Sequence, residues 1–174
     1  KPLIIFGQSA LRSVSAKYIF ESFKQYLKKN NKISKDWNSL NVISENASTV
    51  GSFDLGLYKT EDGSNEVLKN LQNNEYEIVY LLGQDNLKFK KKGEFIIYQG
   101  SHGDKGAEIA DIILPGAAYT EQNGYFTNLE GKLQKAYKAS YPPEDAKEDW
   151  QIINELAESM NHRKLFNDKD ELDS

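Results

Sequence analysis

The chain has 174 residues, of which 39% are hydrophobic and 28% charged, a balance that suits one globular domain and argues against wholesale disorder. Its 22 basic and 26 acidic residues give a net charge of -4, and its small lysine cluster is typical of a solvated loop (Lys88, Lys90, Lys91, Lys92), so we expect no nucleic-acid partner. The sequence has no cysteine to hold a disulfide, an iron–sulfur cluster or zinc, and no apolar run of roughly 20 residues that would insert into a bilayer.

The first two predicted elements are a strand and a long helix. Leu3–Gly7 is a short apolar run ending in glycine, which is the pattern of a strand buried on both faces. Residues 10–29 follow as a helix that Ser9 can cap, and its apolar residues spread over a wide arc. We therefore expect this helix to be covered on more than one side. The chain starts at Lys1, so we expect any targeting peptide to have been removed or never to have been part of it.

The next segments are less regular. Residues 30–39 are polar and loop-like, and 40–57 mix Asn, Ser and Gly with scattered apolar residues. We interpret 40–57 as a structured loop with one helical turn, followed by a short helix at 65–71.

Three further strands are predicted at 76–83, 93–101 and 110–116. Strands that alternate with helices or long connections indicate a mostly parallel sheet with covered faces. Residues 124–138 read as extended chain, and a helix over 145–160 places its apolar side chains on one face (Trp150, Ile153, Leu156, Ala157, Met160). The fold class is therefore α/β with a mostly parallel, doubly wound sheet. We expect a single domain over 2–161 and an acidic, frayed tail over 162–174.

Residues that could line a binding cleft lie where predicted strands end. Gly7 ends the first strand, where a helix start can hold a phosphate, although a tight turn is the simpler interpretation. Gly100, Ser101, His102 and Gly103 follow a later strand, and His102 there could titrate or bond to backbone. Asn46 and Gly51, in the 40–57 loop, could line one wall of the same cleft. His162 is expected to be inert, and the carboxylates show no spacing that demands acid–base chemistry, so we predict no catalytic residue and no metal site.

The stretch at 110–134 carries a family pattern. It reads Ala-Asp, three apolar residues and Pro115, and then a series of spaced polar residues and glycines (Thr120-Glu121, Gly124, Thr127-Asn128, Glu130-Gly131, Gln134). This is similar to the signature of the molybdopterin oxidoreductase superfamily. With "WNSLNVISENASTVGSFDLG", "YLLGQDN" and "EDWQIINELAE" in the same order, most of residues 2–160 resembles the C-terminal part of the largest iron–sulfur subunit of respiratory complex I, the proton-pumping NADH:quinone oxidoreductase.

The resemblance implies a retained molybdopterin-type fold that serves as a structural element of the complex I peripheral arm. Gly7, Asn46, Gly51 and residues 100–103 would then line a vestigial cofactor cleft without molybdenum. Pro115 would end a strand, Gly124 and Gly131 would permit turns, and Thr127 and Asn128 would satisfy loop backbone.

The family subunit is several times longer and begins with a cysteine-rich part that binds iron–sulfur clusters. The simplest account is a split subunit whose cluster-bearing remainder is the partner that completes the sheet, together with other peripheral-arm subunits. A segment of one longer polypeptide would show the same sequence. The expected location is the matrix side of the mitochondrial inner membrane, or the cytoplasmic side of the plasma membrane in a bacterium. The alternatives are a piece of an active molybdenum oxidoreductase such as a formate dehydrogenase, and a free-standing nucleotide-binding module.

Overall fold

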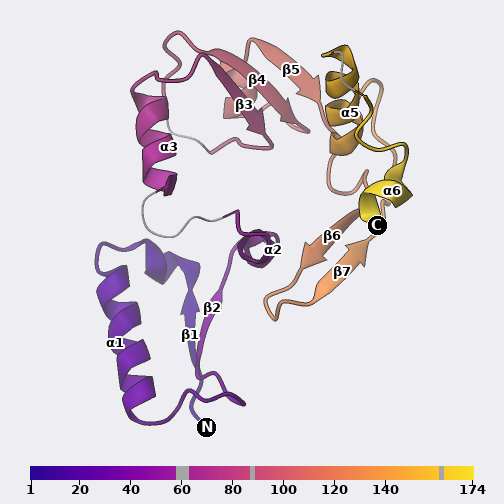
Figure 1. Cartoon of the computed structure of the whole chain (residues 1–174). Coiled ribbons are helices and arrows are strands. Elements are labelled where there is room, and N and C mark those ends of the chain that lie inside the picture. The colour runs from indigo at the N-terminus through magenta and orange to yellow at the C-terminus, as the bar shows by residue number, and fades with distance from the viewer. Residues whose placement is uncertain (58–62, 87–88, 161–162) are drawn as a thin grey trace. The chain divides into compact units, whose positions relative to one another are not determined.

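The computed structural model describes residues 1–57, 63–86, 89–160 and 163–174 (Figure 1). His162 and Lys88 lie outside these residues. The chain divides into two compact units. Unit 1 comprises Lys1–Tyr58 and Tyr125–Gln134, and unit 2 comprises Lys59–Gly124 and Lys135–Ser174. That residues 2–161 form one domain stays a prediction, and each unit is described by itself.

Unit 1 is built on a pair of parallel strands, β1 (Ile4–Gly7) and β2 (Leu40–Ile43). The register pairs Ile4 with Leu40 and Phe6 with Val42, so these four side chains share one face. Helix α1 (Ala16–Lys29) packs on that face through Leu27. Phe6, Leu27 and Leu40 are buried there, with partly buried side chains around them (Ile4, Leu11, Phe20, Ile33).

The long predicted helix is shorter than expected at its N-terminal end. Residues Gln8–Arg12 form a 3-10 helix (η1), and α1 begins only at Ala16. The reason is local, because Ser13 has an extended backbone conformation and its hydroxyl donates to the carbonyl of Ala10. Serine side chains that bond to nearby backbone in this way compete with helix formation. The helix expected from residue 10 is therefore two shorter elements.

The prediction of a loop over residues 40–57 was wrong for the first residues, which form a strand. The predicted helical turn further along is confirmed. Residues Leu40–Ile43 form the strand β2, and one short helix follows as α2 (Thr49–Asp54). Leu40 is buried whereas the rest of the strand is exposed, so the strand shows neither clear alternation nor a long apolar run.

Unit 2 contains a three-stranded parallel sheet in the order β3 (Ile78–Leu82), β4 (Phe95–Gly100) and β5 (Ile112–Pro115). Helix α3 (Gly63–Gln72) precedes β3, and α4 (Lys105–Ile109) connects β4 to β5. Leu81, Ile96 and Tyr98 form the core on one face of this sheet. The α/β class with parallel pairing and the strand positions are thus confirmed.

The four predicted strands do not share one ladder. Among the described residues, β1 pairs with β2, and only the other three strands pair with one another. The prediction that all of them are buried on both faces was also wrong, because β5 is an edge strand whose Ile112 and Ile113 are exposed.

The rest of the chain forms a two-stranded sheet and two helices. Strands β6 (Gly124–Thr127) and β7 (Leu133–Ala136) pair with each other, which confirms the predicted extended segment. Helix α5 (Asp149–Ser159) begins with a capping box between Glu148 and Gln151.

The acidic tail differs from the frayed segment that the sequence predicts. It ends in a short helix, α6 (Lys169–Asp173), whose first turn is capped by Asp168. The segment before α6 is held by the buried Asn154 of α5, whose amide donates to the carbonyl of Phe166 and accepts from Leu165 N at 3.0 Å and Phe166 N at 3.2 Å. Composition alone could not reveal this, because it does not show which side chains elsewhere in the chain bond to the tail.

Candidate functional site

In unit 1, the Gln8 side chain links the segments that follow β1 and β2. Gly7 and Asn46, which the sequence predicts to line a cleft, belong to these segments. Gln8 follows Gly7 directly, and its Oε1 accepts from the backbone N of Glu45 at 2.7 Å. Arg12 reaches the same loop with a 2.6 Å ion pair to Glu45, which is exposed and contributes little to stability. The structure therefore brings the segments that carry Gly7 and Asn46 together, and the polar groups there bond to one another.

Gly51 lies in α2 against the second segment of unit 1. A Cβ atom at this position would stand 3.0 Å from the Oγ1 of Thr127, closer than ordinary van der Waals contact. Gly51 therefore permits the close approach of α2 to β6, and both residues belong to the stretches on which the resemblance rests. From the sequence we expected Thr127 to satisfy loop backbone, and its contact with Gly51 was missed.

In unit 2, the segment from Gly100 to Gly106 packs against the side chain of Tyr98. A Cβ atom at Gly100 would overlap the Tyr98 hydroxyl, and one at Gly106 would lie 2.6 Å from the ring carbons. The Tyr98 hydroxyl donates to the backbone carbonyl of His102 at 3.1 Å. The two glycines thus make room for a side chain of the same chain.

The chemistry of this loop is that of a buried, neutral phenol. Burial, followed by the carboxylate of Asp85, raises the pKa of Tyr98 to about 12. Ser101 and His102 are exposed, and the Ser101 hydroxyl lies 2.9 Å from Nδ1 of His102. A Cβ atom added at Gly103 would meet nothing within 4 Å. Residues 100–103 are contiguous, but Gly7, Asn46 and Gly51 belong to the other unit, so a shared cleft lined by all seven residues stays a prediction.

Several residues of the 110–134 pattern have architectural roles. Pro115 is the last residue of β5, and Gly131 has a φ of 81°, a conformation that favours glycine. The side chain of Asn128 accepts from the backbone N of Glu130 and of Lys132, each at 2.9 Å. These three predictions are confirmed, whereas Gly124 is the first residue of β6 rather than part of a turn.

A buried polar link was not foreseen from the sequence. Tyr80 donates to Oε1 of Gln99, and Nε2 of Gln99 donates to Oδ1 of Asp149 at 2.7 Å. Gln99 is fully buried, so the link joins β3, β4 and the first residue of α5. Burial, and then the negative charge of Asp149, raises the pKa of Tyr80. The only sequence signal was a glutamine in an otherwise apolar strand, which calls for a partner.

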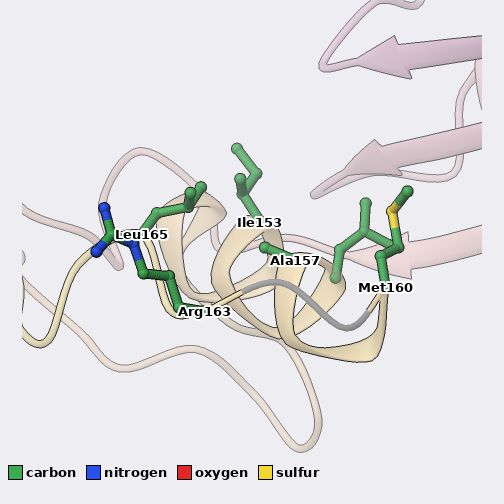
Figure 2. A pocket seen from close by; sticks show the side chains of 6 residues that line it. Ile153, Ala157, Met160, Arg163 and Leu165 are labelled. Carbon is green, nitrogen blue, oxygen red and sulfur yellow. The ribbon is translucent and has the colours of Figure 1, made fainter.

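The apolar face predicted for α5 is largely open. Ile152 and Asn154 are the buried residues of this helix, whereas Ile153 and Met160 are exposed. Figure 2 shows Ile153, Ala157 and Met160 along a groove to which Arg163 and Leu165 also contribute. The groove has a volume of about 380 Å³ and contains no pair of groups suited to acid–base catalysis.

Replacing Gly106 with Ala is expected to destabilise unit 2 by about 1–3 kcal/mol, because the new methyl group would force the Tyr98 ring out of its place. Gly103→Ala is the matched control, since nothing lies within 4 Å of that position, and it should change stability by less than about 0.5 kcal/mol. Hydrogen exchange of the β3–β5 amides measures both. Equal effects of the two substitutions would contradict the packing described above.

Comparisons with known proteins define the class of this fold. The family profile described as molybdopterin oxidoreductase matches residues 1–159. The chain therefore belongs to the molybdopterin oxidoreductase family.

Individual relatives place it more narrowly. The chain is 41% identical over 94% of its length to the NADH-ubiquinone oxidoreductase 75 kDa subunit of Reclinomonas americana. It is 37% identical over 97% to the mitochondrial NADH-ubiquinone oxidoreductase 78 kDa subunit of Candida albicans, and 42% identical over 98% to an NADH-quinone oxidoreductase subunit of Rickettsia bellii. It spans only 23%, 22% and 24% of these relatives.

The family name raises the question of whether the residues present fit a molybdenum cofactor. Within residues 1–57, 63–86, 89–160 and 163–174, no three His, Asp or Glu side chains are grouped so that they could hold a metal ion. The space beside the glycines at the end of β4, where a ligand could approach, is filled by Tyr98 instead. At this position the described residues therefore offer a cofactor neither a group of metal ligands nor open space. None of the helices in the described parts is both long and apolar enough to cross a membrane.

Proposed function

We propose that the chain is a non-catalytic structural part of the peripheral arm of NADH:ubiquinone oxidoreductase, respiratory complex I. Similarity to complex I subunits over 94–98% of the chain supports its membership of that complex. The observation that carries the structural role is the packing of the Tyr98 ring against Gly100 and Gly106, because it places a side chain of the chain itself beside the end of β4, near the sheet edge where ligands bind in this architecture.

In this proposal the chain is the C-terminal piece of a split large iron–sulfur subunit, and it supports assembly and stability of the electron-transfer arm. Its partners are the cluster-bearing remainder of that subunit and other peripheral-arm subunits. The iron–sulfur clusters belong to the remainder, and no molybdenum is bound here. The chain works on the matrix side of the mitochondrial inner membrane, or on the cytoplasmic side of the plasma membrane in a bacterial host. Its relatives come from both kinds of source.

The test is native electrophoresis of the respiratory membranes followed by mass spectrometry. We expect the chain to migrate with complex I, together with a separate polypeptide that carries the cysteine-rich part. Migration apart from the complex would overturn the assignment. Recovery of its peptides from one long polypeptide with the cysteine-rich part would overturn the split.

The second candidate is the C-terminal piece of an active molybdenum oxidoreductase such as a formate dehydrogenase, which the family match favours. Elemental analysis of the purified assembly separates the two. Stoichiometric molybdenum bound at this chain would establish the second candidate, whereas iron without molybdenum supports the first.

Substituting His102 or Glu121 with Ala should leave the NADH:quinone turnover per assembled complex unchanged. The His102 ring is exposed and bonds to the neighbouring Ser101 hydroxyl, and the Glu121 carboxylate accepts from the backbone N of Ala118 at 2.9 Å, which is a loop-stabilising role. The measurement is the electron-transfer rate normalised to the amount of assembled complex. A tenfold or greater fall with assembly intact would show that this chain takes part in the reaction.

A further inference from the structure

The described parts of the connections between the strands of unit 2 pack on one face of its sheet. The segment between β3 and β4 contributes Phe89 to the core, and the segment between β4 and β5 contributes Ala107, Ile109 and Ala110. All of them pack on the side of Leu81, Ile96 and Tyr98. This follows from the strand order, because right-handed crossovers between consecutive parallel neighbours all lie on the same side.

The opposite face is apolar and largely uncovered. By the register it consists of Ile78, Tyr80, Leu82, Phe95, Ile97, Ile112 and Leu114 together with the buried Gln99, and we call it the open face. Ile78 is 64% exposed, Leu82 52%, Phe95 43% and Ile112 46%. Parallel sheets are almost always covered on both faces, so a surface of this kind is unusual in a finished assembly.

The open face could be buried without leaving its polar side chains unpaired. The Tyr80 hydroxyl already donates to Gln99, and Gln99 already donates to Asp149. The cost of burying a polar group arises mainly when its hydrogen bonds are lost, and here they are made inside the unit.

We propose that the open face is the docking surface for an α-helix from the polypeptide that supplies the remainder of the large subunit. This rests on the proposed function. The chain spans 22–24% of its relatives, so more than three quarters of their length lies outside it. In this fold class the second face of a parallel sheet is covered by helices of the same domain. The exposure of Ile78, Leu82 and Ile112 shows that the described helices of unit 2 do not supply that cover.

The first test is co-purification of the chain with the cluster-bearing remainder. Ile78→Asp should lower recovery of the remainder at least about tenfold, because a charge would be buried in the apolar contact. Leu133→Asp is the matched control, since Leu133 is also an aliphatic strand residue and is 62% exposed. It should change recovery by less than about twofold. Equal recovery for both variants would overturn the proposal.

The second test identifies the occupant directly. A photoreactive amino acid in place of Leu82 is cross-linked in the assembled complex, and the attached peptide is sequenced. Attachment to a helix of the remainder supports the proposal. Attachment to another subunit, to a second copy or to unit 1 of the same chain, or no attachment, overturns it while leaving the complex I assignment in place. Absence of the chain from the complex would instead overturn the proposed function itself.

Discussion

Replacing Ile96 with Asp is expected to unfold unit 2. Ile96 is fully buried near the start of β4, the central strand of the sheet, and it packs with the Tyr98 and Leu81 side chains. None of these neighbours carries a positive charge that could neutralise a carboxylate, so the substitution should cost about 4 kcal/mol or more, which is a large part of the stability of a small domain. Protease resistance of residues 63–86 and 89–124 in the assembled complex is the measurement, and it should be lost.

The matched control is Ile113→Asp. Ile113 lies in the edge strand β5 and is 53% exposed, so its carboxylate can reach water. We expect a loss of less than about 1 kcal/mol and intact protease resistance. If Ile113→Asp unfolded the unit as completely as Ile96→Asp, the edge position of β5 would be wrong.

The isolated chain should be poorly soluble or molten, and it should become ordered when it is produced together with the cluster-bearing remainder. Exposed apolar side chains occur in both units, among them Ile5 and Ile43 in unit 1 and Ile78 and Leu82 in unit 2. A lasting attachment that covers them would bury well over roughly 2,000 Å² of total surface, as permanent complexes do.

Dye binding to exposed apolar surface and near-ultraviolet circular dichroism measure this dependence. The chain alone should bind the dye strongly and show weak aromatic signals, and both should reverse on co-production. A sharp, cooperative melt of the isolated chain as a monomer would contradict the prediction.

The strands were predictable where their apolar runs were long enough to differ from loop sequence. Residues 78–82, 95–100 and 112–115 were found for this reason, and their parallel direction followed from the long connections. Strand β2 was missed because it has only four residues in a segment rich in Asn, Ser and Gly. The start of α1 was misplaced because the Ser13 hydroxyl donates to the carbonyl of Ala10. Hydrophobic periodicity does not show whether a serine will bond to nearby backbone in this way or continue a helix.

What covers each element could not be predicted from the pattern. An apolar run indicates that a strand is buried somewhere, but β3 and β5 have their second faces open in this chain. The same limit applies to α5, where the predicted face lines a groove and the buried positions are Ile152 and Asn154. For the candidate site, positions at strand ends were found, but the contacts of Tyr98 with Gly100 and Gly106 depend on a ring conformation that only three-dimensional packing sets.

Unit 1 is discontinuous along the chain, because its first part ends near residue 58 and its second part is Tyr125–Gln134. During synthesis, the N-terminal strands and α1 leave the ribosome long before the segment that carries Thr127, which packs beside Gly51. At roughly 5–20 residues per second, that delay amounts to several seconds. Strands β3, β4 and β5 are all made in the interval. Unit 1 is therefore completed only after the sheet of unit 2 has been synthesised, and a ribosome that stops before residue 125 releases a nascent chain in which neither unit is whole.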